Sequence, residues 1–124
     1  METYIVTLLA KTGHEDQVAQ FYQDMEPLLK EAKGFRGRKI FQSRPGTMAA
    51  AVHKLYPPEE LSGNSHPEHD DKGVMFVMME EWDSIEDRMQ FSRSVAGDRQ
   101  KELIPMLLPN HSHEFYKDVT PASD

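Results

Sequence analysis

The chain has 124 residues, of which 38% are hydrophobic, contains no cysteine and carries a formal net charge of −7. This length fits a single domain, and the missing cysteines exclude disulfides, thiolate nucleophiles and cysteine-based zinc or iron–sulfur sites. The negative charge disfavours polyanionic partners such as nucleic acids and anionic membrane surfaces.

The first half of the chain predicts a strand, a broken helix and a second strand. Residues 4–10 are β-branched and apolar on both parities, which predicts a strand buried on both faces. Apolar residues then recur every three or four positions over residues 15–33, which predicts an amphipathic helix. Pro27 must kink or split that helix because it lacks an N–H. After it, residues 35–43 predict a second strand, more exposed than the first.

A long insertion follows. Residues 44–72 are rich in proline, glycine, serine and asparagine, which are turn and helix-breaking residues. Only residues 48–56 favour a short helix. A connection of this length without regular structure is usually either a functional loop or a disordered segment.

The second half repeats the order of the first. Residues 73–82 predict a third strand buried on both faces, and Ser84 with Asp87 three residues later has the spacing of a helix N-cap. The helix is expected to run to about residue 94, and a further helical piece over residues 98–108 is interrupted by Pro105. Residues 111–119 alternate as a last strand.

The resulting order, β-α-β, loop, β-α-β, is that of the α+β ferredoxin-like fold with a four-stranded antiparallel sheet. We expect one domain over residues 1–124, with the long loop insertion at residues 44–72 between strands 2 and 3. The helices would cover one face of the sheet. Because the other face is also apolar, we expect a homodimer in which a second sheet covers it.

Membrane insertion is not expected. The longest strongly apolar run, residues 74–79, is far shorter than the ~20 residues that span a bilayer. Residues 1–4 show no positive segment followed by a long apolar run, so no signal peptide is predicted. We therefore expect a soluble, cytoplasmic protein that binds neither nucleic acid nor membrane.

Residues 73–92 resemble the antibiotic-biosynthesis-monooxygenase (ABM) domain, in which a strand ends in Glu-Trp and is followed by a serine, an acidic pair and a helix. The central residues of the resemblance are Glu81, Trp82, Asp83, Ser84, Ile85, Glu86 and Asp87. The opening strand, the turn at residues 12–15 and the helix exit at residues 34–35 fit as well. The resemblance covers residues 3–43 and 73–119, and residues 44–72 have no counterpart.

The resemblance implies a dimeric α/β barrel with a pocket between the sheet and helices of each subunit. Monooxygenases of this family act on aromatic, polyketide-like substrates without metal or flavin. Haem-degrading members carry an asparagine on the first strand and a histidine on the helix after the tryptophan. Here residues 8–10 are apolar and Phe91 lies near the histidine position, so haem degradation is disfavoured.

We therefore expect a cofactor-independent monooxygenase that acts on a small aromatic or quinone-like substrate in an apolar pocket. The alternative is a non-catalytic dimeric module of the same fold that binds a small ligand. The pocket is predicted around five residues, namely Trp82, Met78, Phe76, Phe91 and Phe21. For Trp82 and the methionines, packing in the core is the favoured interpretation. No catalytic residue, metal or cofactor is assigned.

Two pairs of histidines invite a chemical interpretation. His111 and His113 share one face of the last strand, opposite Glu114 and Tyr116, and either histidine suits a general base or a surface or interface position. The other pair lies in the long insertion, where acidic side chains make a metal-like cluster, although a solvated loop is the favoured interpretation. That cluster comprises His66, His69, Asp70 and Asp71.

Arg36, Arg38 and Lys39 form a basic cluster on the second strand. Such a cluster would attract an anionic substrate. Charges on an exposed strand edge that prevent aggregation explain it equally well.

Overall fold

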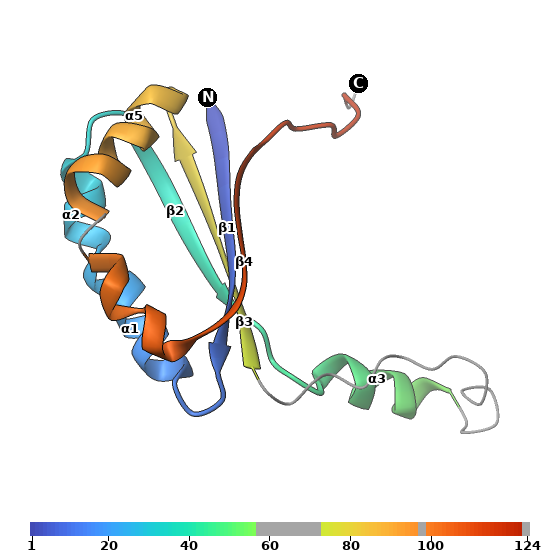
Figure 1. Cartoon of the computed structure of the whole chain (residues 1–124). Helices are drawn as coiled ribbons and strands as arrows, with labels where there is room; N and C mark the ends of the chain where they lie inside the picture. Colours follow the sequence, from blue (N-terminus) through green and yellow to red (C-terminus); the bar gives the residue numbers. More distant parts are fainter. Residues whose placement is uncertain (57–72, 97–98, 123–124) are drawn as a thin grey trace.

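The computed structural model describes residues 1–56, 73–96 and 99–122, and its four strands form one antiparallel sheet in the order β2-β3-β1-β4 (Figure 1). The strands are β1 (Glu2–Lys11), β2 (Phe35–Gln42), β3 (Gly73–Trp82) and β4 (Leu107–Tyr116). The central pair, β1 and β3, is in register from Glu2 opposite Trp82 to Lys11 opposite Gly73. The predicted α+β ferredoxin-like fold is confirmed.

The first helix is split at Pro27, as predicted. Helix α1 (Glu15–Asp24) ends at Met25, and α2 (Glu26–Glu31) begins directly after it with Pro27 in its first turn. Proline is tolerated there because the N–H groups of the first turn have no partner within the helix.

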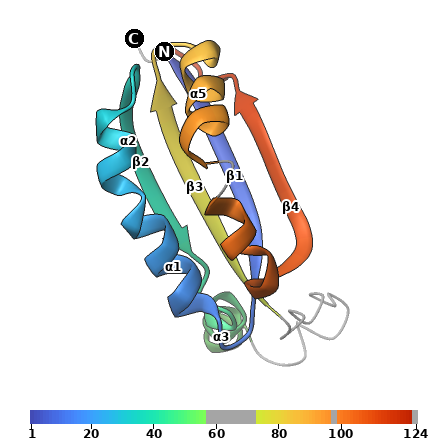
Figure 2. The ribbon, with the colours of Figure 1, turned by 60° about the vertical axis from the view of Figure 1, so that its left-hand side comes forward.

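The connection from β3 to β4 begins with a capped α-helix and continues in short, irregular helical turns. Ser84 caps α5 (Ile85–Phe91), since its Oγ accepts a hydrogen bond of 3.1 Å from the Asp87 N–H. A π-helical turn and two 3₁₀ turns follow: η1 (Ser92–Ala96), η2 (Gln100–Glu102) and η3 (Ile104–Met106). Helices α1, α2 and α5 lie on the same face of the sheet (Figure 2).

The core lies between that face and the helices. Alternate residues of β1 and β3 are buried there, and Val18 of α1, Leu29 of α2 and Phe91 of α5 close over them. The buried strand residues are Tyr4, Val6, Leu8, Ala10, Val74, Phe76, Met78 and Trp82.

The opposite face of the sheet stays open in the single chain, and no helix of the described segments covers it (Figure 1). Apolar side chains on this face are substantially exposed: Phe41 by 49%, Met75 by 40%, Met79 by 37% and Tyr116 by 48%. β1 and β3 were predicted to be buried on both faces. Within one chain only the helix-facing side is buried.

Helix α3 (Thr47–Leu55) lies inside the predicted insertion and buries no residue. It projects beyond the end of the sheet, away from α1, α2 and α5 (Figure 1). The rest of the insertion, residues 57–72, lies outside the described residues. In the described part of the chain no helix is long and apolar enough to cross a membrane, and the cytoplasmic location stays a prediction.

Candidate functional site

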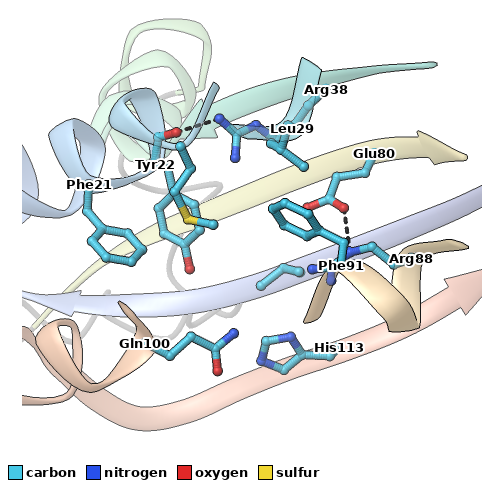
Figure 3. A pocket seen from close by; sticks show the side chains of 11 residues that line it. Phe21, Tyr22, Leu29, Arg38, Glu80, Arg88, Phe91, Gln100 and His113 are labelled. Carbon is cyan, nitrogen blue, oxygen red and sulfur yellow. Dashed lines mark hydrogen bonds and ion pairs between the residues drawn. The ribbon is translucent and has the colours of Figure 1, made fainter. Parts of the chain in front are cut away.

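A small cavity lies between the sheet and the helices (Figure 3). Its apolar wall consists of Val6, Phe21, Met25, Leu29 and Phe91, and its polar wall of Tyr22, Arg38, Glu80, Arg88, Gln100 and His113. Its volume is about 20 Å³, enough for one water molecule. An apolar space with a few convergent polar groups is the usual form of a small-molecule site.

A buried ion pair forms one side of the cavity. Glu80 lies on the helix-facing side of β3, and its Oε1 accepts hydrogen bonds from Arg88 Nε at 2.7 Å and from Trp82 Nε1 at 2.8 Å. The side chains of Glu80 and Arg88 are only 5% and 7% exposed. The Ser84 cap starts α5 so that Arg88 comes one turn later and points down onto the sheet.

Further contacts fix the Arg88 guanidinium in place. It lies 4.3 Å from the centre of the Tyr4 ring, a cation–π contact, and its Nη1 donates to Ser92 Oγ. A guanidinium held by a carboxylate, a hydroxyl and an aromatic face is a preorganised positive charge. Such a group can stabilise negative charge that develops on a bound molecule.

His113 stands at the edge of the cavity. It lies on β4 opposite Val6, and its Nδ1 is 3.3 Å from Tyr4 Oη. Partial burial, together with the nearby His111 and Arg88, lowers the pKa of His113 below its ordinary value. The imidazole is therefore neutral at pH 7 and able to accept a proton when Nδ1–H donates to Tyr4.

Tyr22 points its hydroxyl into the cavity from α1 (Figure 3). Burial, and to a lesser extent the charge of Glu80, raise the pKa of Tyr22 well above its ordinary value. The group therefore stays protonated and acts as a hydrogen-bond donor or acceptor. The Gln100 amide and the His113 ring face the same space from the other side (Figure 3).

Arg38 also lines the cavity, although the sequence placed it in an exposed basic cluster. Its side chain is 2% exposed, and its Nη2 donates to the Tyr22 carbonyl oxygen and, at 2.8 Å, to Glu26 Oε2. Its neighbour Arg36 does stay exposed and pairs with Asp83 at 2.6 Å.

Two of the five residues predicted around the substrate, Phe21 and Phe91, belong to the cavity wall. Phe76, Met78 and Trp82 are fully buried in the core instead. Trp82 packs its ring against Phe91 at 5.8 Å, measured between ring centres, and so supports the wall from behind.

The polar wall was largely missed by sequence reasoning. One signal was present, since Glu80 shares the strand parity of Met78 and Trp82 and a carboxylate among buried residues requires a partner. Arg88 lies three residues before Phe91, on the same helix face, and is that partner.

A metal centre finds no support in the described residues, where no group of three or more His, Cys, Asp or Glu side chains is arranged to hold an ion. The predicted candidates His66, His69, Asp70 and Asp71 lie outside the described residues.

Solved structures share this fold across nearly the whole chain. A proposed antibiotic biosynthesis monooxygenase from Nitrosomonas europaea matches with a TM-score of 0.65 and 12% identity, over 98% of this chain and 93% of that one. A second, from Bordetella bronchiseptica, matches with a TM-score of 0.64 and 15% identity, over 96% and 97%. SnoaB, a cofactor-independent oxygenase from Streptomyces nogalater, matches with a TM-score of 0.60 and 8% identity, over 99% and 98%.

These similarities confirm the predicted resemblance at the level of the fold. No protein-family model and no curated protein matches the sequence. At such low identities a shared fold does not carry a shared activity with it. The activity has to be argued from the cavity.

Proposed function

We propose that the chain is a cofactor-independent monooxygenase of the ABM type, acting on a small aromatic or quinone-like molecule in the cavity between sheet and helices. The observation that carries this proposal is the convergence of a neutral imidazole, His113, and a fixed guanidinium, Arg88, on one apolar space. The named monooxygenases of the same fold support it.

The reaction class needs a substrate with a carbonyl group conjugated to an acidic CH₂ group, as in an anthrone. His113 takes one proton from the CH₂ group, and Arg88 stabilises the resulting enolate. The enolate gives its electrons to O₂, a C–O bond forms at the carbon, and the peroxide takes up the proton. Loss of water from this hydroperoxide, which removes the second hydrogen of the CH₂ group, leaves a carbonyl there. One oxygen atom enters the product and the other leaves as water, so the substrate supplies every electron.

The cavity must enlarge before an aromatic ring can enter, because it now has room for about one water molecule. Gln100 is exposed, and Phe21 is only partly buried against the core. Side-chain movement at these two positions would open the space while the Glu80–Arg88 pair stays in place.

Oxygen uptake with a panel of phenols, quinols and anthrone-like CH₂ compounds tests the proposal. With an active compound, His113→Asn is expected to lower kcat at least tenfold, since general-base catalysis contributes about 10²–10⁴ in rate. In the wild type the rate should fall only in acid, below the ordinary histidine pKa of about 6.5, because the pKa of His113 is lowered.

The matched control is His111→Asn. His111 lies two residues away on the same strand face but does not line the cavity, so its replacement should leave kcat nearly unchanged. Absence of oxygen uptake with the whole panel, or equal losses in the two variants, would refute the proposal.

The second candidate is a non-catalytic module of the same fold that binds a small ligand in the same cavity, since a shared fold does not carry a shared activity with it. The two candidates differ in turnover. Ligand binding without oxygen uptake, unaffected by His113→Asn, is the outcome that identifies the module.

The same proposal includes a homodimer formed through the open face of the sheet. This face presents apolar side chains from three strands, including Phe41, Met75 and Met79, that the single chain leaves exposed. Monomers seldom expose contiguous apolar areas of this kind. A second copy of the same face would cover them.

A further inference from the structure

One buried donor in the cavity wall has no partner. Arg38 Nε is inaccessible to solvent and forms no hydrogen bond within the described segments of the chain. The other bonds of this guanidinium run from Nη2 to the Tyr22 carbonyl oxygen and to Glu26. A buried donor left without a partner costs about 1–3 kcal/mol of stability, which calls for an explanation.

A β-bulge is what brings Arg38 into the cavity wall. Phe35 pairs with Trp82, but the register then shifts, and Arg38 pairs with Glu80. Phe35 and Arg38 therefore both face the helices, which an unbroken alternation would forbid. Bulges often redirect a side chain next to a functional site.

The two guanidinium groups of the cavity wall each have one carboxylate partner. Arg88 pairs with Glu80, whose side chain is 5% exposed, whereas Arg38 pairs through Nη2 with Glu26, which lies outside the wall and is 36% exposed. Tyr22 and His113 are neutral at pH 7, since the pKa of Tyr22 is raised and that of His113 is lowered. Arg38 Nε is thus a buried, charged donor of the wall that no described group accepts from.

We propose that the substrate is an aromatic carboxylic acid whose carboxylate is held by Arg38. This inference rests on the proposed function and names the class of its substrate. A carboxylate would give Arg38 Nε its missing acceptor, in a charge-assisted hydrogen bond. The aromatic ring would then occupy the apolar part of the wall near Phe21 and Phe91, between Arg38 and the His113 end of the cavity.

The probes are salicylate and salicylamide, which share ring size and phenol group and differ in charge. Binding of each is measured by calorimetry at neutral pH, without oxygen turnover. The wild type is expected to bind salicylate at least tenfold more tightly than salicylamide. In Arg38→Gln this preference should disappear, because the anchoring charge is gone.

Arg36→Gln is the matched control. It removes the same charge from the same strand, but Arg36 is exposed and pairs with Asp83 outside the cavity, so the preference should remain. Should Arg38→Gln fold poorly with Glu26 unpaired, the double variant Glu26→Gln/Arg38→Gln removes both members of the pair and is expected to lose the preference too.

Equal affinity of the wild type for both probes overturns the inference, as does no binding of either, or a preference that survives in the Arg38 variants. The outcome is separable from that of the proposed function. If the preference for salicylate is lost in Arg38→Gln but the wild type consumes no oxygen with any aromatic acid, Arg38 is the carboxylate anchor and the monooxygenase is rejected. Oxidation of uncharged anthrone-like CH₂ compounds at equal rates by the wild type and Arg38→Gln, with no preference for salicylate, supports the monooxygenase and rejects the anchor.

Discussion

At the scale of single residues, the Glu80–Arg88 pair is better explained by the site than by stability. Burying two charges costs several kcal/mol per ion, and a hydrophobic pair of the same size is often as stable or more so. The pair here joins β3 to α5 and fixes a guanidinium in the cavity wall. The presence of the pair fits a function that needs positive charge at this point.

Removal of one member should nevertheless be costly. Glu80→Gln leaves the Arg88 charge buried and uncompensated, so the free energy of unfolding is expected to fall by about 3 kcal/mol. Urea denaturation followed by circular dichroism measures the change. Asp83→Asn, which breaks an exposed ion pair with Arg36, is the control and should change stability little. Equal shifts in the two variants would contradict the interpretation of Glu80 as buried and tightly paired.

Sequence reasoning failed on Arg38 because its position depends on a contact that is distant in sequence. Parity along an unbroken strand places residues 35 and 38 on opposite faces, and a basic run with alternating polar residues favours an exposed edge. The bulge between Phe35 and Gly37 depends on pairing with β3, a contact distant in sequence. His113 was identified as a candidate base, but its contact with Tyr4 on β1 required the three-dimensional register.

At the scale of elements, the junction between α2 and β2 sets the position of α5. Gly34 has φ +84° and lies so close to α5 that a Cβ on it would be 2.2 Å from Asp87 Oδ2 and 2.8 Å from Asp87 Cβ. The Gly34 carbonyl oxygen also accepts a hydrogen bond of 2.8 Å from the Asp83 N–H. The start of the helix that carries Arg88 is thus packed directly on this glycine.

Gly34→Ala is expected to destabilise the fold through two effects. The left-handed φ costs an L-residue about 1–2 kcal/mol, and relief of the clash requires the first turn of α5 to move, because Asp87 Cβ is tied to the backbone. Gly13→Ala isolates the first effect, since Gly13 has φ +90° and open space around it. Thermal unfolding should show a clearly larger drop in Tm for Gly34→Ala. Equal drops in Tm for the two variants would mean that Asp87 moves away from the new Cβ without loss of stability.

The elements themselves were predicted well where local chemistry decides them. Pro27 split the first helix and Ser84 capped α5, because proline geometry and N-cap hydrogen bonds act within a few residues. The N-cap of α1, by contrast, is His14, which makes no side-chain cap bond and was not predicted from the sequence. There Glu15 Oε2 accepts a hydrogen bond from the Gly13 N–H instead.

At the scale of the whole molecule, the two faces of the sheet have different environments. One is packed against helices, while the other presents Phe41, Met75, Met79 and Tyr116 to water in the single chain. Each chain carries a formal net charge of −7, so two copies repel one another at long range. The proposed association would therefore come from apolar burial, and salt that screens the repulsion should strengthen it.

Sedimentation velocity at micromolar concentration tests this association directly. The wild type should sediment with twice the 14.3 kDa mass of the chain. Val77→Glu places a charge near the middle of β3 on the open face, and this variant should sediment as a monomer. Met89→Glu introduces the same charge on the exposed side of α5 and should remain dimeric. The two variants carry equal net charge, so only the position of the substitution differs. A compact wild-type monomer, or dissociation of both variants alike, would mean that the open face is not the interface.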